Sequence, residues 1–203
     1  MSNMVRKASV FEILNHWSLA VSFFILTVSG FGFLYHIEGV GSIFGGFNQM
    51  KTIHNWAGVV FSVSLFFTLF SYIVEALSIS GDDIAWIFKG GGYFSKKTVV
   101  PPQGKLNTGQ KLYYLTVLIA GIAITATGLV IWLRPEMADI RKWILLSHLV
   151  HNISFVFMVI AIPLHIYLAT LANPGTVRIM FYGTVPVEWA RKRHPKWVQK
   201  IGA

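Results

Sequence analysis

Residues 143–172 read WILLSHLVHNISFVFMVIAIPLHIYLATLA, a stretch without aspartate, glutamate, lysine or arginine. In an α-helix, about 20 apolar residues cross a bilayer core about 30 Å thick. The stretch therefore predicts a transmembrane helix, and its surplus length predicts that the helix tilts or projects beyond the hydrocarbon. It carries the histidines His148, His151 and His165.

Three more uncharged runs precede this stretch, at residues 17–35, 56–74 and 112–133. The chain is 54% apolar and only 12% charged, so lipid must be its main solvent. We predict an all-α membrane protein, one integral membrane domain over 1–203 with no separate globular domain. Its bundle of four transmembrane helices is expected at about 13–35, 53–76, 111–133 and 143–172, with a basic tail at 173–203.

The first run follows Arg6 and Lys7, as the apolar segment of a signal peptide would. It is longer than such a segment and lacks an Ala-x-Ala cleavage pattern. We therefore expect it to persist as the first transmembrane helix.

The placement of lysine and arginine predicts the orientation of the helices. Most of the 17 basic residues precede the first run, separate the second from the third, or follow the fourth. The opposite side holds Lys51, Arg134, Arg141 and Lys142. Both termini are therefore expected in the cytoplasm, in a multi-pass protein of the inner (plasma) membrane. The net charge of +9 then indicates attraction to anionic lipid headgroups and not to nucleic acid.

The chain has no cysteine, which excludes disulfides, iron–sulfur ligation and haem attached through a Cys-x-x-Cys-His motif. Any metal must be held by nitrogen or oxygen. The glycines at 90–92 do not open a phosphate-binding turn between a strand and a helix, so flexible turns are the better interpretation.

Histidines in the apolar helices form two depth-matched pairs. His54 opens the second helix on the outer side, level with His151 of the fourth. His16 lies at the inner end of the first helix, level with His165. Ionisable groups inside a bilayer are rare and usually functional. The pairs therefore predict two metal cofactors stacked across the membrane, the outer at His54 and His151 and the inner at His16 and His165.

The fourth helix has to serve both levels. His165 follows His151 by about four turns, so the two side chains point the same way within about 40° and lie about 21 Å apart. His148 is about 100° from His165 by the same geometry, which makes it the poorer ligand candidate.

Two glycines lie where a flat macrocycle would need close approach of the backbone. Gly30 follows His16 by about four turns, on the same face at the outer level. Gly58 lies one turn after His54 and makes similar room. Ordinary packing of helices through small residues would also explain either glycine taken alone.

Two imidazoles on opposing helices suit haem iron better than zinc. Zinc takes three or four ligands of mixed type around one centre, and no carboxylate lies at the depth of either pair. In haem the porphyrin fills the other four positions of the iron. Iron ligated on both sides has no vacant position for oxygen, which favours electron transfer over oxygen chemistry.

Seven short motifs are distributed along nearly the whole chain. They are Asn15-His16-Trp17, Ile53-His54 with Gly58, Asn107-Thr108-Gly109-Gln110-Lys111, Trp132-Leu133-Arg134-Pro135, Leu149-Val150-His151, Leu164-His165-Ile166-Tyr167 and WARKRHP at 189–195. In this order and spacing the chain resembles the cytochrome b (gamma) subunit of respiratory formate dehydrogenases. It resembles the cytochrome b of membrane-bound hydrogenases more distantly.

The resemblance implies a single cytochrome b domain with two haem b groups, held by the same histidine pairs. It implies that Asn107, Gly109 and Gln110 form a pocket with His165 for a quinone, which is menaquinone in the family. It further implies an iron–sulfur subunit and a catalytic subunit on the extracytoplasmic side, and is compatible with a higher oligomer of the complex. The chain would carry electrons inward to the quinone without itself oxidising the primary donor.

Two alternatives stay open. The same di-haem subunit would also serve a hydrogenase or a thiosulfate or polysulfide reductase. A haem-free membrane scaffold, or a transporter that relays protons through histidines, would be colourless and would leave the shared face of His151 and His165 unexplained.

Two glutamates and two tryptophans are expected at the interface between membrane and water. Glu12 and Glu75 are expected to be interfacial carboxylates, with proton relay to a quinone as the alternative. Trp189 and Trp197 in the basic tail predict an interfacial anchor or a contact with another subunit.

Overall fold

The computed structural model describes residues 3–93, 98–133 and 140–202. Lys96, Lys97, Arg134 and Pro135, which the charge and motif arguments use, lie outside these ranges. The chain forms two compact units, and each is described by itself. Unit 1 is Met1–Ile13, Leu69–Thr116 and His165–Ala203, and unit 2 is Leu14–Thr68 and Val117–Leu164.

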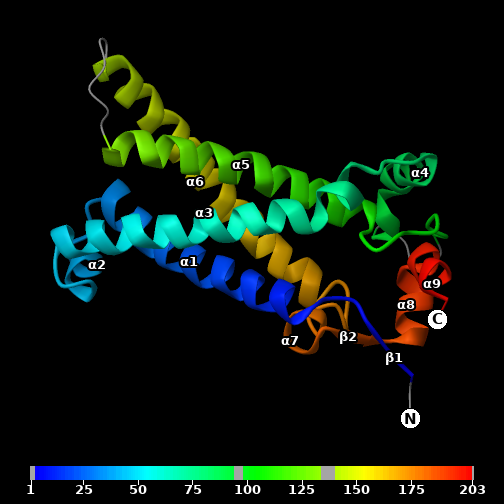
Figure 1. Cartoon of the computed structure of the whole chain (residues 1–203). Helices are drawn as coiled ribbons and strands as arrows, with labels where there is room; N and C mark the ends of the chain where they lie inside the picture. The colour runs from blue at the N-terminus through cyan, green and yellow to red at the C-terminus, as the bar shows by residue number, and fades with distance from the viewer. Residues whose placement is uncertain (1–2, 94–97, 134–139, 203) are drawn as a thin grey trace. The chain divides into compact units, whose positions relative to one another are not determined.

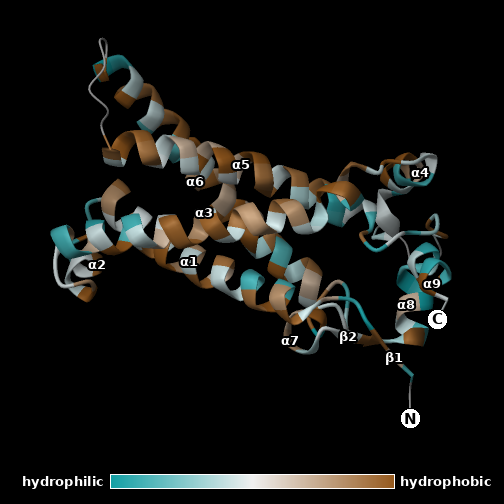
Figure 2. Ribbon diagram, in the orientation of Figure 1, coloured by the Kyte–Doolittle hydropathy of each residue, from teal (hydrophilic) through white to brown (hydrophobic). Residues whose placement is uncertain are grey.

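Four helices in the described ranges are long and apolar enough to cross a membrane (Figures 1 and 2). They are α1 (Val10–Leu34), α3 (Phe47–Leu77), α5 (Thr108–Leu133) and α6 (Ile140–Thr170). They confirm the predicted all-α membrane fold. α3 begins at Phe47 and not at the predicted 53, because the helix continues through a polar turn that hydropathy does not mark.

Large apolar side chains cover the outer faces of these helices. Phe24, Phe70, Ile119 and Ile160, one on each helix, are 65–70% exposed. Apolar exposure of this extent along every long helix is costly in water but matches hydrocarbon. Lipid is therefore the medium that these faces fit.

Polar side chains inside unit 2 tie neighbouring helices together. Asn15 of α1 donates through Nδ2 to the Ser64 carbonyl at 3.0 Å and to Thr68 Oγ1 at 2.9 Å, both on α3. The hydroxyls of Ser62 and Thr125 lie 3.1 Å apart and join α3 to α5. Hydrogen bonds of this kind hold membrane helices together where no hydrophobic effect drives their association.

A polar cap is formed within unit 1 by residues 3–9, 78–93, 98–107 and 171–202. Strand β1 (Met4–Arg6) pairs antiparallel with β2 (Thr184–Pro186), with Val5 opposite Val185. The cap's short helices are α4 (Gly81–Phe88), the 3-10 turn η1 (Gly90–Gly92), α7 (Ile179–Tyr182), α8 (Val187–Arg193) and α9 (Pro195–Ile201). α8 contacts α9 and both strands (Figure 1). A further short helix, α2 (Glu38–Ile43), connects α1 to α3 in unit 2.

The basic tail folds into the core of this cap. The buried core comprises Ala8, Ile179, Val185, Ala190, Trp197 and Val198. Trp197 is only 7% exposed, and the rings of Trp189 and Trp197 lie 5.5 and 5.6 Å from the ammonium of Lys7. The expectation of an interfacial anchor is therefore wrong for Trp197, because its ring is used in packing.

Lys7 and His194 form a buried polar pair at the centre of the cap. His194 Nδ1 donates to the Gly104 carbonyl at 2.7 Å, so Nε2 accepts from Lys7 Nζ at 2.5 Å. Burial, helped by the charge of Lys105, lowers the pKa of Lys7 to about 7. Burial and the neighbouring Lys7 lower the pKa of His194 to about 3. The histidine is therefore neutral and ties the N-terminal segment to the tail.

Reciprocal hydrogen bonds start three helices in the described chain. In each, the residue before the helix and the residue three positions later bond one another's backbone N–H groups. The pairs are Ser9 with Glu12 at α1, Ser80 with Asp83 at α4, and Asn107 with Gln110 at α5. Glu12 also pairs with Lys105 at 3.5 Å.

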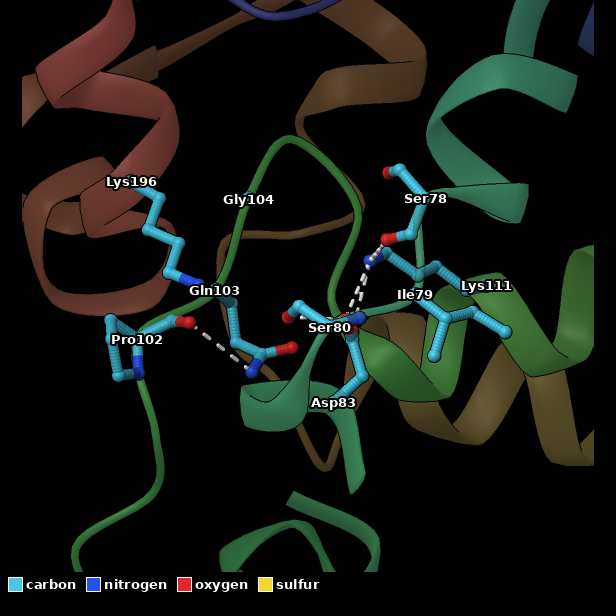
Figure 3. Close-up of a pocket in the computed structure, with 9 residues that line it drawn as sticks. All are labelled: Ser78, Ile79, Ser80, Asp83, Pro102, Gln103, Gly104, Lys111 and Lys196. Carbon is cyan, nitrogen blue, oxygen red and sulfur yellow. Dashed lines mark hydrogen bonds and ion pairs between the residues drawn. The ribbon is translucent and has the colours of Figure 1, made fainter. Parts of the chain in front are cut away.

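Asp83 and Lys111 form a buried ion pair that joins α4 to α5. Lys111 Nζ lies 2.9 and 3.0 Å from the two carboxylate oxygens and donates to the Ser78 carbonyl at 2.6 Å. Burial alone would raise the pKa of Asp83, but hydrogen bonds from Lys111, Thr108 and Ser80 hold it at about 2. The pair lines a cavity of about 320 Å³ (Figure 3).

Asp83→Asn is expected to destabilise the cap by about 3–5 kcal/mol, because Lys111 stays buried without its counter-charge. Protease cleavage of the purified protein between α3 and α5 should rise by roughly a hundredfold to a few thousandfold, since it follows the population of the open form. Asp82→Asn is the control, because the Asp82–Lys196 pair is 39–43% exposed and contributes about 1 kcal/mol or less. Equal cleavage of the two variants would contradict this assignment.

The Asp83 carboxylate also predicts an acid limit for the cap. Its folded pKa of about 2 lies below its ordinary value, so its contribution to stability is complete above about pH 4. It is lost as the pH falls toward 2. Protease cleavage of the wild-type cap, measured against pH with an acid-active protease, should therefore rise below pH 4 more steeply than cleavage of Asp83→Asn.

Candidate functional site

His54 lies near the start of α3 and contacts α1. Its Nδ1 is 2.7 Å from Oγ of Ser29, a residue that is 0% exposed. Phe33 of α1 meets the imidazole edge-on, with ring centroids 5.5 Å apart at 87°. These contacts hold the ring on the α1 side of α3.

His151 lies on α6 and contacts α5. Its Nδ1 is 3.1 Å from Thr127 Oγ1. A Cβ added to Gly128 would lie 3.2 Å from Cε1 of His151. Gly128 therefore leaves the space that lets the ring lie against α5.

The surroundings of His54 and His151 meet through α1. Ser29 contacts His54, and the adjacent Gly30 faces Phe155 of α6, one turn beyond His151. A Cβ on Gly30 would lie 3.0 Å from the Phe155 ring. Adjacent residues of α1 therefore contact His54 and a neighbour of His151 on α6, and the pairing of the two rings stays a prediction.

The predicted roles of Gly30 and Gly58 receive different support. Gly30 has a packing reason to be small, because the Phe155 ring fills the space beside it. A Cβ on Gly58 would meet, among the described atoms, only Leu26 Cδ2 at 4.0 Å. A side chain or a cofactor could therefore lie against α3 at Gly58 without a clash.

The predicted inner ligands fall in different units. His16, in unit 2, meets Trp17 edge-on with centroids 5.7 Å apart, and the adjacent Asn15 joins α1 to α3. His165, in unit 1, stacks on Tyr113 of α5 with centroids 4.7 Å apart at 14°. Their pairing stays a prediction.

The Asn-x-Gly-Gln turn is a helix cap in which the side-chain NH2 groups take no part in the cap bonds. The Asn107 and Gln110 side-chain oxygens accept from each other's backbone N–H at 2.8 and 2.9 Å. Each amide therefore keeps an NH2 donor for another acceptor. Gly109 admits the Trp86 ring, which would lie 2.9 Å from an added Cβ. Tyr113 follows Gly109 and Gln110 by one turn, so it links this end of α5 to His165.

Sequence reasoning missed Ser29, Thr127, Gly128 and Tyr113. Ser29 and Thr127 lie in the outer parts of their predicted helices, so depth alone could have drawn attention to them. Of the remaining histidines, His36 stacks on Phe47 with centroids 4.6 Å apart, and His148 is exposed.

A family model described as prokaryotic cytochrome b561 matches residues 7–183. The chain belongs to this family. The cytochrome is accordingly a multi-pass membrane protein, and membership implies haem b.

The cytochrome is similar over nearly its whole length to subunits of formate dehydrogenases. The formate dehydrogenase cytochrome b556(fdo) subunit of Escherichia coli (strain K12) is 32% identical over 193 residues, which cover 94% of this chain and 90% of the relative. The nitrate-inducible cytochrome b556(Fdn) subunit of the same strain is 26% identical, over 98% and 93% of the two chains. The formate dehydrogenase cytochrome b556 subunit of Haemophilus influenzae is 26% identical, over 92% and 79%.

The chemistry of His54 and His151 is compatible with haem b, which these two residues would hold. In each ring Nδ1 contacts a hydroxyl, so Nε2 would be the nitrogen that coordinates iron. The space beside Gly58 adjoins the same level of α3. The donor set therefore matches a haem ligated by two imidazoles.

Gly128→Ala should displace the His151 ring, because the added methyl lies closer than van der Waals contact, at a cost of about 1–3 kcal/mol. We expect a shifted low-temperature absorption band or altered electron paramagnetic resonance g-values for one haem. In the control Gly121→Ala, the new Cβ would press on Leu65 at 2.7 Å and touch no histidine. Gly121→Ala should lower stability with an unchanged spectrum. A wild-type spectrum in Gly128→Ala would refute this role for Gly128.

Proposed function

We propose that this cytochrome is the membrane electron-transfer subunit of a formate dehydrogenase and passes electrons to quinone. The observation that carries the proposal is the similarity over 94% of the chain to a formate dehydrogenase cytochrome b556 subunit. The arrangement of histidines along the long helices supports the same function. Oxidation of formate itself belongs to another subunit, since this chain has no cysteine for iron–sulfur ligation.

The proposal includes two haem b groups, an outer one at His54 and His151 and an inner one at His16 and His165. Haem b supplies a one-electron iron centre that is low-spin and closed to oxygen when both axial positions are filled. The chain's own residues orient the imidazoles and surround them with apolar side chains that exclude water.

The quinone would bind where the cap meets α5 and α6. The NH2 groups of Asn107 and Gln110, which the cap bonds do not use, are donors suited to a quinone carbonyl, and Gly109 keeps the helix start close to Trp86. The stacking of Tyr113 on His165 brings this helix start to the inner ligand. We assign menaquinone as the physiological acceptor.

The proposed orientation has the cap and both termini in the cytoplasm and the protein in the inner membrane. Lysines and arginines concentrated in the cap support this, because basic segments stay on the cytoplasmic side. Electrons would then move inward from an extracytoplasmic iron–sulfur subunit while protons for quinone reduction are taken up inside. Turnover would charge the membrane.

The proposed partners are an iron–sulfur subunit and a catalytic formate dehydrogenase subunit. A hydrogenase or a thiosulfate or polysulfide reductase is less well supported, since the relatives described above are all formate dehydrogenase subunits. Purification of the complex by a tag on this chain should bring down a formate-oxidising subunit, identified by mass spectrometry and by formate-dependent haem reduction. Recovery of a hydrogenase subunit in its place would overturn the assignment of the donor.

The haem assignment predicts the content of single variants, measured by pyridine haemochrome on the purified complex. Wild type should hold two haems per chain. His54→Ala and His151→Ala should lose the same haem, and His16→Ala and His165→Ala the other. His148→Ala should keep both. Fewer than two haems in wild type, or both retained in His54→Ala, would contradict the pairing.

The quinone assignment predicts that Asn107→Ser and Gln110→Glu raise the KM for a menaquinone analogue about tenfold, through the loss of one hydrogen bond. Each replacement keeps the oxygen that caps α5 and removes the NH2 donor. Haem content should stay at the wild-type value, which separates this effect from unfolding. An unchanged KM in both variants would exclude these amides from the quinone site.

A further inference from the structure

Two hydroxyl groups in unit 2 hold the rings of the outer histidines. Ser29 Oγ lies 2.7 Å from His54 Nδ1, and Thr127 Oγ1 lies 3.1 Å from His151 Nδ1. The hydroxyls come from different helices, α1 and α5, and their histidines from two others. A contact between a hydroxyl of one helix and the Nδ1 atom of a histidine on another helix is therefore present twice.

The proton of each hydroxyl is already used inside its own helix. Ser29 Oγ donates to the Ile25 carbonyl at 2.7 Å, and Thr127 Oγ1 donates to the Ala123 carbonyl at 2.7 Å. A hydroxyl has one proton and two acceptor lone pairs. Toward the histidine, each oxygen can therefore only accept, and Nδ1 of each ring must carry the hydrogen.

The hydrogen bonds of Thr127 support this assignment at His151. Thr127 Oγ1 lies 2.7 Å from the Ala123 carbonyl and 3.2 Å from the Ile124 carbonyl, so its hydrogen is shared between two carbonyls of α5. Since a carbonyl only accepts, the hydrogen in the contact with His151 must come from the ring. A neutral imidazole with its hydrogen on Nδ1 presents a lone pair at Nε2.

We propose that Ser29 and Thr127 are positioning residues that fix the tautomer and orientation of the outer pair of axial ligands and set the reduction potential of the outer haem. The inference rests on the proposed function, because it assigns these residues a role only if His54 and His151 ligate haem. Neither hydroxyl touches the iron, so both act through the histidines.

The direction of the effect follows from the hydrogen bond. An acceptor on Nδ1–H makes the imidazole a stronger electron donor at Nε2. A stronger donor stabilises the oxidised iron, so the hydroxyls lower the potential of the outer haem. Their removal should therefore favour the reduced state.

Other hydroxyls in unit 2 have no such partner and serve as matched controls. Ser22, 3% exposed and on the same helix as Ser29, donates to the Ser18 carbonyl at 2.8 Å. Thr125, which lies two residues before Thr127 on α5, contacts the hydroxyl of Ser62. Neither has a hydrogen bond to an imidazole among the described residues, so their loss removes a contact of the helices and leaves the histidine contacts in place.

The test is a redox titration of the haems in the purified complex, with Ser29→Ala and Thr127→Val. Each variant should shift the oxidation equilibrium of one haem about tenfold toward the reduced state, which is about 59 mV for one electron. The double variant should shift the same haem further, since the hydroxyls act on separate ligands. Retention of that haem should also fall, within the range of about 10–100-fold in affinity seen when such outer partners are lost.

Thr127→Ser, Ser22→Ala and Thr125→Val complete the experiment. Thr127→Ser keeps the acceptor and should keep the wild-type potential, which a role of the Thr127 methyl in packing alone would not predict. Ser22→Ala and Thr125→Val should leave both potentials at their wild-type values. If they shift the outer haem as much as Ser29→Ala does, the inference is overturned.

Failure of this inference is distinguishable from failure of the proposed function. If His54→Ala and His151→Ala leave the haem content unchanged, no haem binds there and the proposed function fails. If they each remove the same haem, but Ser29→Ala and Thr127→Val leave its potential unchanged, the hydroxyls have no positioning role and the proposed function stands.

Discussion

The absence of water around the long helices constrains the rest of the structure. Backbone polar groups are satisfied inside each helix, so polar side chains bond either to carbonyls of their own helix or to groups on neighbouring helices. Asn15 joins α1 to α3 in this way, Ser29 meets His54, and Thr127 meets His151. The bonds that satisfy these groups also fix the orientation of the imidazoles. Helix packing and the orientation of these imidazoles therefore depend on the same contacts.

The cap buries charged residues by two different physical means. The carboxylate of Asp83, whose pKa is held at about 2, pairs with the Lys111 side chain within a hydrogen-bonded cluster. Lys7 has no carboxylate partner in the described cap, and its pKa falls to about 7 beside a neutral His194. The Asp83–Lys111 pair is stabilised by opposite charges. In the Lys7–His194 pair, the lowered pKa of Lys7 reduces the cost of burial, because the ammonium can lose its proton near neutral pH. Both tie segments that are distant in sequence.

Hydropathy predicted α1, α3, α5 and α6 because lipid demands long apolar runs. It could not predict the contacts of Ser29 or Thr127, since one hydroxyl barely changes the hydropathy of a run and its partner depends on a neighbouring helix. The Asn107–Gln110 cap was readable as a helix start, but its connection to His165 through Tyr113 requires the packing of two helices. The pairing of β1 with β2 escaped notice because strands of three residues show no periodicity.

The pairing of β1 with β2 has a consequence for the order of events during synthesis. Met4–Arg6 leaves the ribosome first, yet its partner Thr184–Pro186 is made only after α6. Domains begin to fold as the chain emerges, but a contact of this sequence separation has to wait for its second half. The strand that precedes α1 therefore cannot form its pairing with β2 until the chain beyond α6 has been translated.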